Sequence, residues 1–225
     1  MKKAYLALAA GCLLAFSTAS HAESGDVNIG VKGGTLGIGL EAGVDLSDTF
    51  ALRGGINYLT YDFDTTISSI DYNFEPQFFN GSLLTDWYPF TNSFRLTAGA
   101  YINDNEIKVE GTYRKDKIPS EYARYADLTD LAKVKGTVEF NTFAPYVGLG
   151  WTSNQGDSGW GVNVDIGVMF QGAPTVSELY VDDPLGVGSH PIVTAFLDDE
   201  RQAIEDELDN FEYYPVASIS LKYKF

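Results

Sequence analysis

The chain has 225 residues, with 31 acidic against 15 basic side chains, a formal net charge of −16 and a pI near 4.3. An acidic excess of this size argues against binding to nucleic acid and against simple electrostatic attachment to an anionic membrane surface. A single cysteine excludes a disulfide framework within the chain.

The first residues have the layout of a secretory signal peptide. Two lysines are followed by an apolar run up to Phe16, and Ser-His-Ala ending at Ala22 places small residues where signal peptidase needs them. The run is shorter than the roughly 20 apolar residues of a membrane-spanning helix, and it continues past Cys12, where a lipoprotein signal would end. We predict a signal peptide over residues 1–22 and one domain over residues 23–225. Cleavage would remove two lysines and no acid, leaving 13 basic against 31 acidic side chains and a net charge of −18.

The rest of the chain repeats an alternation of large apolar residues with small or polar ones. Every second side chain of a strand lies on the same face, so the pattern predicts strands with one apolar and one polar face. The alternation is present in residues 27–32, 36–46, 50–58, 79–87, 94–103, 143–151, 160–170 and 215–225.

The composition of the two faces separates a soluble sandwich from a membrane barrel. The polar positions are mostly Gly, Ala, Ser and Asn with a few charges, whereas a soluble sandwich would show many charged residues there. Small polar residues suit a narrow lumen, and bulky apolar residues suit lipid. The longer segments have about the 9 to 11 residues that a tilted strand needs to cross hydrocarbon. The sequence therefore predicts an all-β fold, a transmembrane antiparallel up-and-down β-barrel.

The number of strands depends on Gly33-Gly34, where the apolar positions change from odd to even. A hairpin at these glycines gives eight strands, the interpretation that we favour. A bulge inside one long strand would require a further strand, for example at residues 176–181, and could lead to ten.

The connections divide into two kinds. Short turns are expected at residues 47–48, 91–92 and 154–158, and long connections at residues 64–71, 108–135 and 171–212. Bacterial barrels have short turns in the periplasm and long loops outside. Aromatic side chains gather where lipid tails meet headgroups, so we expect an aromatic girdle on the short-turn rim, formed by Trp87, Trp151 and Trp160.

The signal peptide, the alternating strands and the ending Leu221-Lys222-Tyr223-Lys224-Phe225 resemble those of small Gram-negative outer-membrane barrels of the OmpA, OmpX or OmpW type. The resemblance implies localisation in the bacterial outer membrane, with lipid and lipopolysaccharide as surroundings. The ending is similar to the signal that the barrel-assembly machinery recognises. It implies Leu221, Tyr223 and Phe225 as an assembly signal, and that machinery and periplasmic chaperones as partners during biogenesis.

Charged residues also occur among the positions predicted to face the lumen. Buried charges must be paired, so the first hypothesis is a network of ion pairs that closes the barrel. The second is a narrow polar pore for small solutes, less favoured because side chains mostly fill an eight-stranded barrel. The charged residues predicted to face the lumen are Glu41, Asp45, Arg53, Asp86, Arg95, Asp165, Lys222 and Lys224.

The sequence contains no convincing catalytic, cofactor-binding or metal-ligating set. The only histidine after the predicted signal peptide, His190, adjoins Ser189 in a segment rich in glycine and proline. Neighbouring loop residues rarely point at one another, so we predict a plain loop and no enzyme. Lipid A modification is the enzymatic alternative.

The last long connection is strongly acidic. Residues 171–214 contain eleven acidic side chains and one basic side chain, Arg201. An apolar stripe predicts a helix over residues 194–210, and a second short helix is expected over residues 120–133, with Ser120 as N-cap. The acidic loop is either a solvated helix packed on the barrel rim or a site that captures divalent cations. The predicted function is a structural or surface-interaction barrel.

Overall fold

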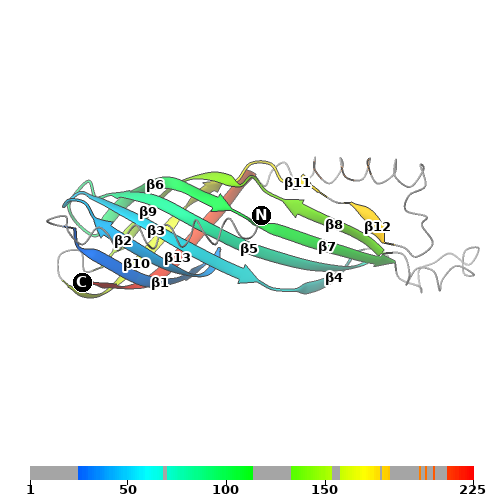
Figure 1. The fold of residues 1–225 in the computed structure, drawn as a ribbon, viewed down its shortest axis with the longest axis horizontal. Coiled ribbons are helices and arrows are strands. Elements are labelled where there is room, and N and C mark those ends of the chain that lie inside the picture. Colours follow the sequence, from blue (N-terminus) through cyan, green and yellow to red (C-terminus); the bar gives the residue numbers. More distant parts are fainter. Residues whose placement is uncertain are drawn as a thin grey trace, which may run out of the picture.

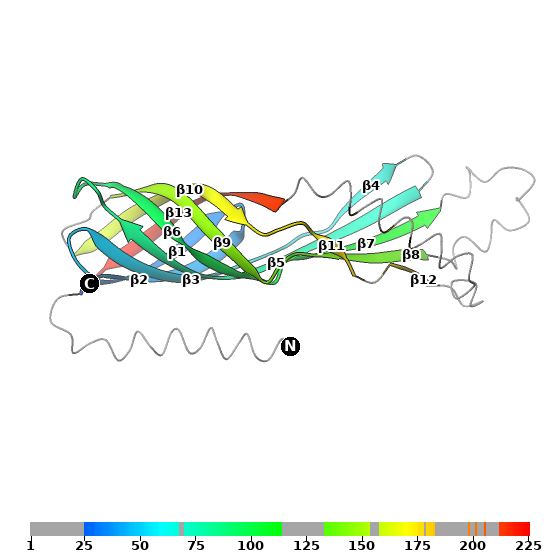
Figure 2. The ribbon, with the colours of Figure 1, turned by 90° about the horizontal axis from the view of Figure 1, so that it is seen from above.

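The computed structural model describes residues 25–67, 70–113, 133–153, 158–177, 179–182 and 212–225, together with Asp198, Arg201 and Glu205. A closed antiparallel barrel forms one end of the molecule, and a sheet continues from one side of the barrel beyond its rim (Figures 1 and 2). The predicted signal peptide lies outside the described residues.

Eight strands close the barrel, which confirms the favoured number. Their order around the wall is β1-β2-β3-β5-β6-β9-β10-β13, and β13 pairs with β1 to complete the circle. The strands are β1 (Val27–Gly34), β2 (Gly37–Asp45), β3 (Phe50–Thr60), β5 (Ile70–Trp87), β6 (Phe94–Asn103), β9 (Phe143–Thr152), β10 (Gly159–Phe170) and β13 (Tyr213–Lys224).

The first hairpin differs from the prediction in the position of its turn. Gly33 and Gly34 still belong to β1, and Gly34 pairs with Gly37, so the turn consists of Thr35 and Leu36. Gly37 has a φ of +95°, which a glycine adopts without the strain of a Cβ. Leu36, expected on the lipid face, is buried. The change from odd to even positions therefore comes from the turn.

The expected long connections are partly wrong, because strands continue through them. β4 (Phe63–Ile67) and β5 pair down to Ile67 and Ile70, leaving two residues between them where a loop over residues 64–71 was expected. The expected connection over residues 108–135 likewise begins and ends in strands. These are β7 (Glu106–Tyr113) and β8 (Lys133–Glu139), which pair with each other. Two short strands, β11 (Thr175–Val176) and β12 (Tyr180–Asp182), pair with β8 and add to the projecting sheet instead of to the barrel.

The projecting sheet is a direct extension of the barrel wall. β5 runs through both parts, and its register with β3 continues into β4: Thr60 pairs with Gln77, and Phe63 pairs with Phe74. β6 and β9 continue in the same way into β7 and β8. Two long hairpins, β3–β4 with β5 and β6–β7 with β8–β9, thus lie side by side and extend beyond the other strands.

A proline explains the interruption between β3 and β4. Pro76 lies opposite Tyr61 and has no N–H to donate to the Tyr61 carbonyl. One hydrogen bond of the pair remains, from Tyr61 N–H to Pro76 O at 3.4 Å. The strand therefore loses its regular ladder at this point but keeps its register.

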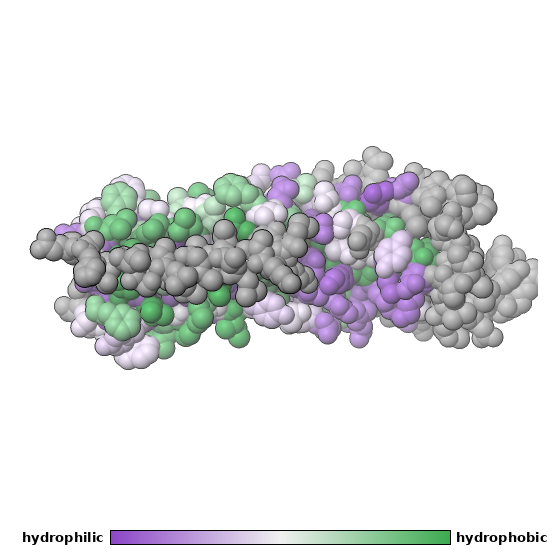
Figure 3. Space-filling view, in the orientation of Figure 1, coloured by the Kyte–Doolittle hydropathy of each residue, from purple (hydrophilic) through white to green (hydrophobic). Residues whose placement is uncertain are grey.

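The outside of the barrel is apolar, as predicted, and the predicted charged side chains point inside. Leu96 and Ile219 face outward with 39% and 59% of their surface exposed, while Arg95 and Lys222 on the same two strands are buried. Hydrophobic residues gather over the barrel in Figure 3, and hydrophilic residues gather over the projecting part. From Trp160 to Phe170, β10 spans about 33 Å along the strand, and a tilt of about 40° reduces this to about 25 Å, the height of the apolar band of such barrels.

The alternation reverses where the two hairpins leave the barrel. On β5 the outward face changes from Leu83 and Trp87 to Asn73 and Glu75, although the strand is continuous. The same reversal occurs on the other long strands, where the outward positions above the rim are Lys108 and Glu110 on β7 and Lys133, Lys135, Thr137 and Glu139 on β8. Because the pleat is unchanged, the reversal marks the level at which hydrocarbon ends and water begins.

Among the residues that the structure describes, no helix is long and apolar enough to cross a membrane. Of the predicted helix over residues 194–210, Asp198, Arg201 and Glu205 are described, and all three are helical. The second predicted helix, residues 120–133, lies outside the described residues except for Lys133. The prediction is wrong at Lys133, which is the first residue of β8.

Candidate functional site: the charged lumen

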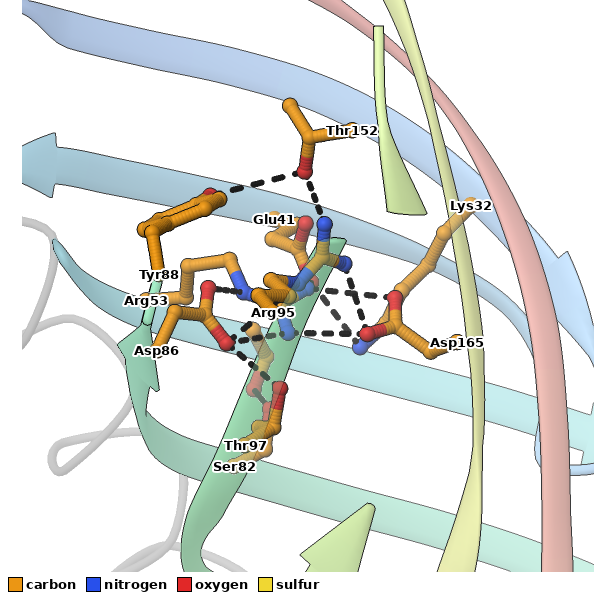
Figure 4. A network of polar contacts seen from close by, with 11 residues as sticks. Lys32, Glu41, Arg53, Ser82, Asp86, Tyr88, Arg95, Thr97, Thr152 and Asp165 are labelled. Carbon is orange, nitrogen blue, oxygen red and sulfur yellow. Dashed lines mark hydrogen bonds and ion pairs between the residues drawn. The ribbon is translucent and has the colours of Figure 1, made fainter. Parts of the chain in front are cut away.

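Five strands each send one charged side chain to a common point inside the barrel (Figure 4). The positions follow from the strand period of two, since each of these residues lies on the inward face of its strand. All five side chains are buried. They are Glu41 on β2, Arg53 on β3, Asp86 on β5, Arg95 on β6 and Asp165 on β10.

Arg53 binds three carboxylates at once. Its Nη1 lies 3.1 Å from Glu41 Oε2, and its Nε and Nη2 lie 2.5 and 3.0 Å from the two oxygens of Asp86. Nη1 and Nη2 also donate to Asp165, at 3.2 and 3.0 Å. The planar guanidinium carries five N–H donors, so it can satisfy several carboxylates where a lysine could not.

Arg95 joins the same carboxylates from the other side of the lumen. Its Nη2 donates to Asp165 Oδ1 at 2.7 Å, and its Nε lies 3.4 Å from Asp86 Oδ1. Its Nη1 donates to the Thr152 hydroxyl, which also lies 3.4 Å from the Tyr88 hydroxyl. The cluster therefore links β2, β3, β5, β6, β9 and β10 across the barrel.

Four polar partners of this cluster were not singled out from the sequence. Thr97 donates to Asp86 at 2.6 Å, and Lys32 lies 3.6 Å from Glu41. Thr152 accepts a hydrogen bond from Arg95, and Tyr88 lies beside Thr152. The alternation could have predicted that Lys32, Thr97 and Thr152 point inward. It could not have done so for Tyr88, which follows the end of β5.

The charges of the cluster balance. Lys32, Arg53 and Arg95 carry three positive charges, and Glu41, Asp86 and Asp165 carry three negative ones. Pairing of this kind is required because an isolated buried charge costs several kcal/mol.

Glycines make room for the arginines. An added Cβ at Gly150 would lie 3.0 Å from the Arg95 guanidinium, and one at Gly43 would lie 3.2 Å from the Arg53 side chain. At these distances the arginine side chains would have to shift by a few tenths of an ångström to admit a Cβ. The small residues of the inward row therefore fit the large side chains that cross the lumen.

An apolar layer shares the lumen with the charged cluster. Tyr101 and Tyr146 meet edge to face with their ring centroids 5.4 Å apart. Other buried residues of this layer are Leu36, Leu84, Ala144, Met169 and Val216. Two kinds of packing, charged and apolar, therefore fill the barrel interior.

The remaining lumen charges lie toward the short-turn end. Lys224 Nζ lies 2.8 Å from Asp45 and 3.1 Å from Asp26, which precedes β1. Lys222 is buried two residues earlier on β13. Of the eight predicted lumen residues, five therefore meet around Arg53 and Arg95, and Asp45 and Lys224 form a separate ion pair.

The predicted girdle and assembly residues lie at the same end of the barrel. Trp87, Trp151 and Trp160 are 45%, 45% and 66% exposed next to the short turns. Trp160 packs edge to face on Tyr223, and Tyr223 on Phe225, at centroid distances of 5.3 and 5.1 Å. With Leu221, these residues form a continuous aromatic and apolar surface on the outside of β10 and β13.

Other predicted sites lie partly or wholly outside the described residues. Ser189 and His190 are among them, as is most of the acidic connection proposed for divalent cations. Within the described ranges, the structure has no group of three or more His, Cys, Asp or Glu side chains arranged to hold a metal ion.

A closed eight-stranded barrel with this apolar belt is the fold of the small outer-membrane β-barrels of Gram-negative bacteria, and it belongs in the bacterial outer membrane. Solved structures that share the fold include two outer-membrane proteins of one species. CarO2 of Acinetobacter baumannii is 18% identical with a TM-score of 0.61, and the match covers 90% of this chain and 100% of that one. CarO of the same species is 19% identical with a TM-score of 0.57, and covers 89% and 98%. No family model matches the sequence, and a search of curated proteins returned no match.

Proposed function

We propose that the protein is a closed, non-conducting barrel that anchors an extracellular sheet in the outer membrane. The observation that supports this function is the buried cluster in which Arg53 and Arg95 join Glu41, Asp86 and Asp165 across the lumen. An open pore needs a continuous path of water, and these side chains occupy that path with direct contacts of 2.5 to 3.4 Å.

The projecting sheet supports the second half of the proposal. A barrel that only spans the membrane needs no strands beyond the hydrocarbon, yet β4, β5, β7 and β8 continue in register above it. Long connections of bacterial barrels face the outside. The sheet would therefore be presented at the cell surface, while the charged lumen gives it a rigid base.

Planar bilayer recording tests the closed state. We expect the wild type to show no reproducible unitary currents, and the Arg95→Ser variant to show currents because it removes the guanidinium between Asp86 and Asp165. Lys135→Ser is the matched control, since it removes one positive charge from the projecting sheet and leaves the lumen intact. A shift in gel mobility on boiling in detergent verifies that each variant is folded.

Steady wild-type currents that change in Arg95→Ser and not in Lys135→Ser would contradict the proposal and favour the narrow solute channel.

The proposal also excludes an enzymatic role. A lipid A modification assay with a Ser189→Ala control tests this part of the proposal. Modification that depends on Ser189 would overturn it.

A further inference from the structure

The two edges of the projecting sheet differ. On one side, β8 is covered by β11 and β12. On the other side, β4 pairs with β5, and within the described ranges no strand pairs with its outer edge. Figures 1 and 2 show β4 at the border of the sheet in both views. An edge strand of this kind is a template on which another strand can form hydrogen bonds.

The register shows which backbone N–H and C=O groups of β4 point away from β5. Tyr61 N–H bonds to Pro76 O, so odd-numbered residues of this strand turn their backbone groups toward β5. Antiparallel ladders alternate, and the N–H and C=O groups of Asp64 and Thr66 therefore point away from β5. An added strand would find donors and acceptors at these two residues.

Aromatic rings line one face of this edge. Tyr61 and Phe63 stack with centroids 5.9 Å apart, and Phe63 stacks on Phe74 at 5.1 Å. Tyr61 and Phe63 are 46% and 43% exposed. Every second side chain of an added strand would lie beside this row, so apolar residues at those positions would bury ring surface.

The other face of the edge is acidic. Asp62 and Asp64 are exposed there, and Asp64 accepts one hydrogen bond from Asn73 at 2.9 Å. The sequence has no lysine or arginine between Arg53 and Arg95, so the whole tip of this hairpin lacks basic side chains. The alternate residues of an added strand would therefore be favoured if they were cationic. A second copy of the chain would bring the same acids against each other, which disfavours it.

We propose that the outer edge of β4 binds an extended cationic segment of another polypeptide by strand addition, with apolar residues on the aromatic row and basic residues beside Asp62 and Asp64. This interaction would occur whether or not the lumen conducts.

Fluorescence anisotropy with three labelled heptapeptides tests the proposal on the folded protein in zwitterionic detergent. The first peptide alternates lysine with valine, the second alternates glutamate with valine, and the third has the composition of the first with its lysines in one block. We expect binding of the first peptide alone. Removing both acids with Asp62→Asn and Asp64→Asn should weaken it about three- to tenfold. Asp182→Asn on the opposite edge is the matched control and should leave the affinity unchanged.

The backbone contribution has its own variant. Thr66→Pro removes an outward N–H at a position where an edge strand tolerates proline, so the barrel should fold and the affinity should fall at least about fivefold. Equal binding of the block peptide, or no effect of Thr66→Pro, would overturn strand addition and leave charge attraction. If the correctly folded protein bound none of the peptides, the proposal would be wrong and the edge would be covered by the chain itself. If analytical ultracentrifugation showed a dimer that Thr66→Pro disrupts, the proposal would be wrong and the edge would be covered by a second copy.

Discussion

Arg95 on β6 reaches across the lumen to Asp165 on β10, with Nη2 and Oδ1 2.7 Å apart. The two strands are separated in the wall by β9, so the pair is a contact through the interior and not between neighbours. The same Asp165 oxygen accepts from Arg53 at 3.0 Å. One carboxylate thus joins two arginines that enter from different sides of the barrel.

Replacing Asp165 should strongly destabilise the barrel. Asp165→Asn removes the charge that two buried arginines share, and breaking a buried pair typically costs about 3–5 kcal/mol. Urea unfolding in lipid vesicles, followed by the mobility shift on boiling, measures the loss. Asp182→Asn removes an exposed partner of Lys135 and should cost about 1 kcal/mol or less. Equal losses in the two variants would contradict the importance of the lumen cluster.

Glycines on the two faces of the wall should respond oppositely to alanine. A Cβ at Gly148 would clash with the Tyr146 hydroxyl, whereas no atom of the described residues lies within 4 Å of one at Gly81. Gly148→Ala should cost about 1–3 kcal/mol through overpacking. Gly81→Ala should be neutral or stabilise by about 0.5–1 kcal/mol. Unfolding midpoints measured side by side test this, and a neutral Gly148→Ala would show that the lumen has spare room.

The reversed alternation predicts where lipid ends. Leu83→Arg places a charge on the outward face within the apolar band and should cost about 2–4 kcal/mol. Thr137→Arg places the same side chain on the outward face of β8 above the rim and should cost about 0.5 kcal/mol or less. Comparing unfolding in vesicles with unfolding in detergent locates the boundary. Similar costs for both variants would mean that the projecting sheet also contacts hydrocarbon.

The contact between β8 and β12 predicts a pH dependence. The hydrogen bond from Lys135 to the Asp182 carboxylate raises the pKa of Lys135 above its ordinary value. A raised pKa means that this contact stabilises the sheet fully below the ordinary lysine pKa, and that its contribution disappears as the pH rises through the higher folded value. NMR titration of labelled lysine side chains should show Lys135 titrating late, and Asp182→Asn should return it to the ordinary range. A late titration that persists in Asp182→Asn would refute the assignment.

Local alternation was enough to identify most of the barrel. Ile38, Leu40 and Leu221 lie on the outward face where the period of two placed them, and Glu41 and Lys222 lie inside. Residues 106–113 and 133–139 were not recognised as strands because charged residues such as Lys108, Glu110 and Lys135 occupy their outward row, where the barrel strands have apolar residues. The signal was present in the sequence, but it could be interpreted only once the level of the membrane was known.

The class of protein was predictable from the sequence, because the polar row of the alternating strands has small residues and too few charges for a soluble sandwich. The alternation also placed eight charged residues on the inward row, although Lys32 was missed. Which of them meet depends on the closed barrel: strand tilt and register bring Arg53 and Arg95 to Asp86 and Asp165 and pair Lys224 with Asp45. Closure of the wall joins β1 to β13, so the distances across the lumen depend on contacts between strands that are remote in the chain.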